Sequence, residues 1–86
     1  MVTIAEQAMA DVKQILLEAG FVDDGESIAG RKRYVKRGTN IKATVGKRTT
    51  AIYRIEGPGL NGVRSLASLS TRDLGGLRAL LQSLSA

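Results

Sequence analysis

Apolar side chains recur at helical spacing over the first twenty residues, and this pattern predicts an amphipathic helix with one buried stripe. The stripe consists of Ile4, Ala8, Val12, Ile15, Leu16 and Ala19. Thr3 followed by Glu6 is typical of a capping box, in which the two side chains satisfy free backbone N–H groups at the start of a helix. Gly20 predicts the end of the helix, because glycine readily adopts the left-handed conformation found there, and Phe21 follows as its hydrophobic contact. The next segment, Asp23-Asp24-Gly25-Glu26, predicts an acidic loop.

From residue 31 to residue 56 the pattern changes to alternation, which predicts three short antiparallel strands. Ile41, Ala43 and Val45 alternate with polar residues, and a second alternating run covers 49–55. A three-residue loop, Gly46-Lys47-Arg48, would pair Val45 with Thr49, Ala43 with Ala51 and Ile41 with Tyr53, so that all apolar partners share one face. A two-residue loop at Lys47-Arg48 would instead oppose Ile41 with Arg54. The pattern therefore favours the three-residue loop.

The first of these strands, about 31–37, has two alternative registers. A turn at Gly38-Thr39 directs Tyr34 inward, opposite Ala43, while Arg33, Val35 and Arg37 face outward. A longer loop that includes Asn40 directs Val35 inward and sets Lys36 opposite Lys42. Because two like charges directly opposed are unfavourable, we expect the first register.

The last thirty residues predict a connection followed by a second helix. Residues 57–70 are rich in Gly and Ser, and we expect a short helical turn near 63–69. Ser70 or Thr71 is the expected cap of the second helix, with Asp73 in its first turn. The apolar stripe of this helix is formed by Leu74, Leu77, Leu81 and Leu84, and Leu80 beside it leaves room for a homodimer contact. Gly75 and Gly76 are expected to permit close packing on the sheet.

These elements predict the fold class α+β. The expected architecture is a two-layer α-β-β-β-α domain, a three-stranded antiparallel meander with both helices on one face. A chain of 86 residues has room for one core, so residues 1–86 are expected to form a single domain. The absence of cysteine favours a soluble cytoplasmic protein. No run of apolar residues has the length of a membrane span, and the first residues do not resemble a signal peptide.

The residue types present argue against an enzyme. The chain has no histidine, which removes the commonest general base and the commonest metal ligand, and no cysteine, which excludes a thiolate metal site. Asp23, Asp24 and Glu26 lack the spacing of a calcium loop, so no metal site is expected. Gly57-Pro58-Gly59-Leu60-Asn61-Gly62 matches G-x-G-x-x-G, but no parallel strand remains to complete a dinucleotide site, and we interpret it as a turn. No catalytic residue and no cofactor are predicted.

The charge pattern favours a polyanionic partner. Residues 1–30 contain one lysine and six carboxylates, whereas residues 31–54 contain nine Lys or Arg and no acid. Side chains of one sign repel each other, and a phosphate backbone relieves that repulsion. The predicted nucleic-acid-binding residues are Arg31, Arg33, Arg37, Lys42, Lys47, Arg48 and Arg54.

The expected strand registers give these residues a common surface. They would place Arg33, Arg37, Lys42, Thr44, Thr50 and Arg54 on the sheet face that the helices leave open, with Lys47 and Arg48 at the hairpin tip. Tyr34 and Tyr53 are both expected to face inward, so the backbone of a duplex is favoured over stacked single strands, and the sequence does not decide between DNA and RNA. The alternative functions are a solubilising surface and a protein-interaction module, such as an inhibitor of phage or mobile-element type that binds a host protein.

Two families share the expected layout. The order α-β-β-β-α over residues 3–85 resembles that of double-stranded RNA-binding domains and of HicA-type toxins, and the junction Leu17-Glu18-Ala19-Gly20-Phe21 is similar to the end of the first helix in HicA-type chains. The catalytic histidine of those toxins has no counterpart here, so the resemblance does not imply ribonuclease activity. Ser70-Thr71-Arg72-Asp73 also differs from the lysine cluster that begins the second helix of the RNA-binding family. The resemblance is one of layout.

Overall fold

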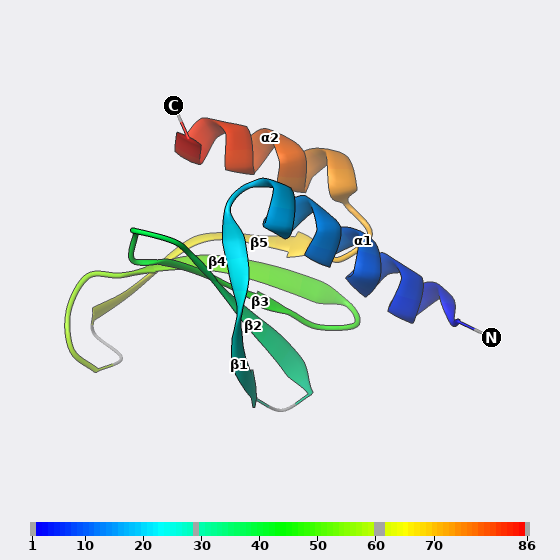
Figure 1. Ribbon diagram of the computed structural model, residues 1–86, viewed down its shortest axis with the longest axis horizontal. Helices are drawn as coiled ribbons and strands as arrows, with labels where there is room; N and C mark the ends of the chain where they lie inside the picture. Colours follow the sequence, from blue (N-terminus) through cyan, green and yellow to red (C-terminus); the bar gives the residue numbers. More distant parts are fainter. Residues whose placement is uncertain (1, 29, 60–61, 86) are drawn as a thin grey trace.

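The computed structural model describes residues 2–28, 30–59 and 62–85, and it is an α+β arrangement of two helices and one five-stranded antiparallel sheet. Each strand pairs with the next strand in the chain, in the order β1-β2-β3-β4-β5, so the sheet is a continuous meander. Figure 1 shows a strongly twisted sheet, as expected from the right-handed twist of strands. The two helices lie next to each other. The elements are α1 (Ile4–Glu18), β1 (Phe21–Ile28), β2 (Arg31–Lys36), β3 (Ile41–Val45), β4 (Thr49–Ile55), β5 (Val63–Ser70) and α2 (Leu74–Ser85).

Helix α1 begins and ends where the sequence predicts. The Thr3 hydroxyl accepts a hydrogen bond from the backbone N–H of Glu6 at 3.1 Å, which is one half of the capping box. Gly20 follows the helix with a φ of +93°, in the left-handed region that favours glycine. The predicted stripe is buried from Ala8 to Leu16 and partly buried at Ala19, whereas Ile4 remains 71% exposed. The helix therefore packs through its last three turns, and its first turn projects beyond the core.

The first strand of the sheet, β1, was missed by the sequence prediction. The segment expected to be an acidic loop belongs to this strand, and Asp23 lies opposite Tyr34 of β2. The register of β1 and β2 shifts between Asp23 and Ser27, so the strand does not show regular alternation. Two ion pairs, Asp23–Lys32 and Asp24–Arg33, place the acidic segment against the basic one. The side chain of Glu26 lies outside the described residues.

The last strand, β5, was also missed, and the expected helical turn at 63–69 was wrong. This segment pairs with β4 along its whole length, from Val63 opposite Ile55 to Ser70 opposite Thr49. The register shifts at Ile52 and Tyr53, where β5 has one extra residue, Leu66. A bulge of this kind interrupts the alternation of side chains, so the pattern of leucines no longer has a period of two. Of the Gly-rich segment 57–62, residues 57–59 and 62 lie between β4 and β5, where the backbone N–H of Gly57 bonds to the carbonyl of Gly62, and Leu60 and Asn61 lie outside the described residues.

The hairpin of β3 and β4 differs from the sequence prediction, which favoured a three-residue loop. Val45 lies opposite Thr50, Ala43 opposite Ile52 and Ile41 opposite Arg54, and the backbone N–H of Gly46 bonds to the carbonyl of Thr49 at 2.9 Å. The connection is thus the two-residue turn Lys47-Arg48. This register buries Ile52 completely, which stabilises the fold by about 1.5–3 kcal/mol relative to an exposed side chain. Arg54 lies opposite Ile41 near the end of β4, where it is half-buried.

The register of β2 and β3 confirms the sequence prediction. Tyr34 lies opposite Ala43, and Val35 lies opposite Lys42. Tyr34 is 3% exposed, and this burial raises the pKa of its hydroxyl above the ordinary value of 10.0. The alternative with Lys36 opposite Lys42 is absent, in agreement with the argument from like-charge repulsion.

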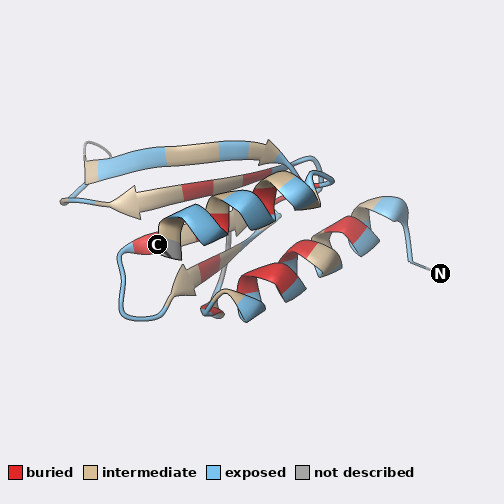
Figure 2. Cartoon of the chain, turned by 90° about the horizontal axis from the view of Figure 1, so that it is seen from above, coloured by how far each residue is buried: buried red, intermediate tan, exposed pale blue. Residues whose placement is uncertain are grey.

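One hydrophobic core joins the helices to the sheet. Both α1 and α2 contribute to it, together with side chains of β1, β2, β3 and β4, and Figure 2 shows these buried positions in red. Its members are Val12, Ile15, Leu16, Phe21, Tyr34, Ile41, Ala43, Val45, Ile52, Leu77 and Leu81. Leu80, expected to leave room for a dimer contact, packs against this cluster. A homodimer stays a prediction.

Helix α2 begins later than the sequence predicts. Its cap is Asp73, whose carboxylate accepts a hydrogen bond from the backbone N–H of Gly76 at 2.9 Å. Thr71, one of the two expected caps, is instead fully buried, and its hydroxyl donates to the carbonyl of Gly46 at 2.7 Å. In the described part of the chain, neither helix has the length and apolar character needed to cross a membrane.

Candidate nucleic-acid interface

The alternation of the strands gives the sheet two chemically different faces. We define the core face as the side that carries Tyr34, Ala43 and Ile52, and the outer face as the opposite side. Strand pairing arranges the outer face in rows that cross the sheet. One row is Val35, Lys42, Tyr53 and Ser65, and the next is Arg33, Thr44, Ala51 and Ser68.

Three of the predicted binding residues lie on the outer face: Arg31, Arg33 and Lys42. The side chain of Arg31 extends to Thr49 of β4. Its guanidinium donates one hydrogen bond to the hydroxyl and one to the backbone carbonyl of Thr49, each at 3.1 Å. Gly46 permits this path, because a Cβ at that position would lie 3.0 Å from Nη1 of Arg31. Arg33 pairs with Asp24 at 2.6 Å. Lys42 forms no ion pair with any carboxylate that the structure describes.

Two more of these residues, Lys47 and Arg48, are exposed at the tip of the β3–β4 hairpin, as the sequence predicts, although in a two-residue turn in place of the expected three-residue loop. The guanidinium of Arg31 lies beside this turn, because its partner Thr49 is the first residue after it. Five of the seven predicted residues therefore follow one path, which leads from Lys42 and Arg33 through Arg31 to the hairpin tip. We call these five residues the basic path.

The other two predicted residues are placed elsewhere. Arg37 is exposed in the turn that follows β2. Arg54, expected to face outward, lies on the core face opposite Ile41 and next to Arg64 of β5, because the hairpin register differs by one residue from the expected one. For the same reason Thr50, also expected outward, is buried and bonds to the hydroxyl of Thr71 at 3.1 Å.

The acidic residues of β1 neutralise part of the basic segment. Lys32, on the same face as Tyr34, bonds to Asp23 at 2.8 Å. This hydrogen bond holds the pKa of the Asp23 carboxyl below its ordinary value of 3.8 and the pKa of the Lys32 ammonium above 10.5. The nine cations of residues 31–54 thus do not act as one uniform field. Within the basic path, Lys42, Lys47 and Arg48 have no carboxylate partner among the residues that the structure describes.

Sequence reasoning missed two features of the outer face. Tyr53 lies there, directly opposite Lys42 on β3 and Ser65 on β5, although it was expected to face inward. The hydroxyls of Ser65 and Ser68 also extend the face, because the segment expected to be a connection is strand β5. The run Thr49-Thr50-Ala51-Ile52-Tyr53-Arg54-Ile55 carries apolar residues in both phases, so its alternation alone does not select a face.

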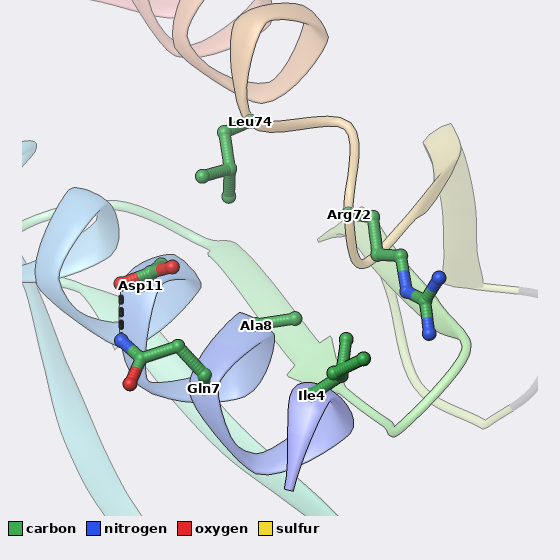
Figure 3. A pocket seen from close by; sticks show the side chains of 6 residues that line it. All are labelled: Ile4, Gln7, Ala8, Asp11, Arg72 and Leu74. Atoms are coloured by element: carbon green, nitrogen blue, oxygen red, sulfur yellow. Dashed lines mark hydrogen bonds between the residues drawn. The ribbon is translucent and has the colours of Figure 1, made fainter.

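A separate groove lies between the start of α1 and the segment that joins β5 to α2. Its volume is about 260 Å³, and Figure 3 shows its lining side chains: Ile4, Gln7, Ala8, Asp11, Arg72 and Leu74. Gln7 donates to Asp11 at 2.9 Å along one rim. Two exposed apolar residues, Val2 and Ile4, stand at this end of the molecule.

The described side chains offer no group of three metal-ligating residues. Asp23 and Asp24, the acidic residues considered for such a role, are engaged by Lys32 and Arg33. Comparison of the chain with protein-family models, with curated proteins and with solved structures finds no match.

Proposed function

We propose that this protein is a small non-enzymatic nucleic-acid-binding protein that acts in the cytoplasm and binds the phosphate backbone through the basic path. The proposal includes the arrangement expected from the sequence, in which both helices cover one face of the sheet and leave the outer face to the ligand. The ligand class is DNA or RNA.

The observation that carries the proposal is the basic path itself. Lys42, Lys47 and Arg48 have no carboxylate partner among the described residues, and Lys47 and Arg48 are exposed. Phosphates bound there would release condensed counterions, and arginine grips phosphate through two hydrogen bonds. The hydroxyls of Thr44 and Ser68 on the same face are additional donors to phosphate oxygens.

The proposal is tested by salt-dependent binding of labelled oligonucleotides to three variants compared with the unsubstituted protein. Lys42→Gln removes a cation of the basic path, and the double variant Lys47→Gln/Arg48→Gln removes the two at the hairpin tip. Lys13→Gln, on the exposed side of α1, is the control for the single loss of charge. We expect the slope of log K against log salt to fall by about 0.7–0.9 for each lost phosphate contact, with no change for the control.

Two results would contradict the proposal. One is the absence of binding to DNA and RNA at low salt. The other is a loss of affinity in Lys13→Gln as large as that in Lys42→Gln, which would mean that net charge alone attracts the ligand.

A protein-interaction module, such as an inhibitor of phage or mobile-element type, is the second candidate, and the groove at Ile4 favours it. An isoleucine that is 71% exposed beside an apolar groove is typical of a contact surface. This function predicts a stoichiometric protein complex that survives nuclease treatment and is lost in Ile4→Asp. A complex retained by that variant would place the contact elsewhere.

A further inference from the structure

The outer face carries an aromatic ring beside a cation. Tyr53 lies directly opposite Lys42, and side chains opposite each other in an antiparallel pair have Cβ atoms about 4.5–5.5 Å apart. The ring and the ammonium are thus within the reach of a single nucleotide. Tyr53 is half-buried, so part of its side chain is open to a ligand.

The neighbours of Tyr53 towards β5 are small. Ser65 lies directly opposite it, and the next row contains Ala51 and Ser68. Both serines are exposed, and none of the three is large enough to cover an aromatic ring. The bulge at Ile52 and Tyr53 sets this arrangement, because it brings Ser65 rather than Leu66 opposite Tyr53.

The other aromatic residues of the chain are in the core. Phe21 is 1% exposed and Tyr34 is 3% exposed, and both belong to the hydrophobic cluster. Tyr53 is therefore the single aromatic side chain of the sequence on the outer face, and it lies in the row next to Arg33 and Thr44.

We infer that the outer face binds single-stranded nucleic acid, with an unpaired base stacked on Tyr53 and the adjacent phosphate bound by Lys42. This inference rests on the proposed function and names its ligand. Single strands present free base faces, whereas the bases of a duplex are stacked on each other and inaccessible to a ring on the face of a sheet. The duplex preference expected from the sequence depended on an inward Tyr53, and the observed register removes its premise.

The test compares short single strands of DNA and RNA with a duplex of the same length, by fluorescence anisotropy at low salt. We expect either single strand to bind more tightly than the duplex. Loss of one base–aromatic stack corresponds to a decrease in affinity of about 5- to 150-fold, so Tyr53→Leu should abolish the preference for single strands. Tyr53→Phe retains the ring and should retain the preference.

A second measurement reports the ring itself. The chain has two tyrosines and no tryptophan, so in a Tyr34→Phe background Tyr53 is the only source of tyrosine fluorescence. Stacking of a base on this ring should quench its emission in step with the anisotropy change. Emission unchanged at saturating oligonucleotide would overturn the inference.

The outcomes separate the two proposals. Equal affinity for single strand and duplex, with no effect of Tyr53→Leu but a lower salt slope in Lys42→Gln, would overturn the stacking inference and leave the proposed function in place. Absence of binding to all three probes would overturn both.

Discussion

At the scale of single residues, the clearest electrostatic feature is the pair formed by Asp23 and Lys32. The carboxylate accepts from the Lys32 ammonium and from the backbone N–H of Gly25, both at 2.8 Å. These bonds favour the charged forms, which lowers the pKa of Asp23 and raises that of Lys32. Both groups are exposed, so water and salt weaken the pair.

The pair predicts how stability depends on pH. Because the pKa of Asp23 is lower in the folded state than in the unfolded state, its stabilising contribution is present above pH 3.8 and is lost as the pH falls through the folded pKa. The contribution of Lys32 is present below pH 10.5 and is lost as the pH rises through its raised value. In Asp23→Asn we therefore expect a smaller loss of stability on acidification below about pH 4 than in the unsubstituted protein.

The measurement is the urea midpoint between pH 2 and pH 7 for both proteins, at low salt and at high salt. High salt should bring the two curves together, because it screens exposed charges. Two curves that are parallel throughout at low salt would show that the pair does not contribute.

At the scale of elements, the start of α2 shows how two adjacent glycines differ. Gly75 is exposed, and a Cβ at this position would have no heavy atom within 4 Å, so the expected close packing on the sheet is wrong there. A Cβ on Gly76 would instead collide with the carboxylate of Asp73, the cap of the helix. Gly76 therefore preserves the cap.

This difference predicts opposite effects of two similar substitutions. Gly75→Ala should raise the free energy of unfolding by about 0.5–1 kcal/mol, because alanine loses less backbone entropy in a helix. Gly76→Ala should raise the free energy of unfolding by less than Gly75→Ala does, or lower it, because displacement of the Asp73 cap costs about 1 kcal/mol. Urea unfolding of both variants checks the prediction, and equal gains would show that the cap is not disturbed.

The elements also show where prediction from the pattern was reliable. Helix α1 followed from regular spacing, and the β2–β3 register followed from the repulsion that Lys36 opposite Lys42 would cause. Strands β1 and β5 were missed because each contains an irregularity that interrupts the alternation that identifies a strand. In β1 it lies between Asp23 and Ser27, and in β5 it is the extra residue Leu66, opposite Ile52 and Tyr53 of β4. The acidic residues of β1 also suggested a loop, because consecutive carboxylates are typical of an exposed connection. Their ion-pair partners, Lys32 and Arg33, lie on the neighbouring strand β2 and become apparent only when the two strands are paired.

At the scale of the whole molecule, a buried polar contact joins segments far apart in the sequence. Thr71 precedes α2, and its hydroxyl donates to the carbonyl of Gly46 and contacts the hydroxyl of Thr50. Its backbone N–H bonds to the carbonyl of Arg48 at 2.9 Å. The contact thus attaches the hairpin tip, with Lys47 and Arg48, to the base of α2.

Removal of this contact should destabilise the fold. Thr71→Val keeps the shape but leaves the Gly46 carbonyl without its donor, which costs about 1–3 kcal/mol in a buried site. Thr71→Ser retains the hydroxyl and should cost less. We expect the double variant Thr50→Val/Thr71→Val to lose less than the sum of the single variants, because the two hydroxyls are partners. Urea unfolding measures all of these variants, and a Thr71→Val protein as stable as the unsubstituted one would contradict the role of the contact.

The same contact explains why the candidate site was predicted in part. Residues of the hairpin tip and of the outer face, such as Lys47 and Arg33, were placed correctly because turns and regular alternation fix them locally. Thr50, Tyr53 and Arg54 were assigned to the wrong faces because the register of β3 and β4 depends on what fills the core. Burial of Ile52 and the bond between Thr50 and Thr71 favour the observed register, and neither is visible along the chain.

The sequence by itself determined the α+β class, helix α1 with its cap, the alternating segments, and a surplus of cations between residues 31 and 54, because spacing, capping and charge are local properties of the chain. Only the tertiary structure decided the number of strands, which cations are paired with β1, and that Tyr53 lies beside Lys42. A one-residue change of register reverses every side chain of a strand, and the register is selected by packing between segments that are distant in the sequence.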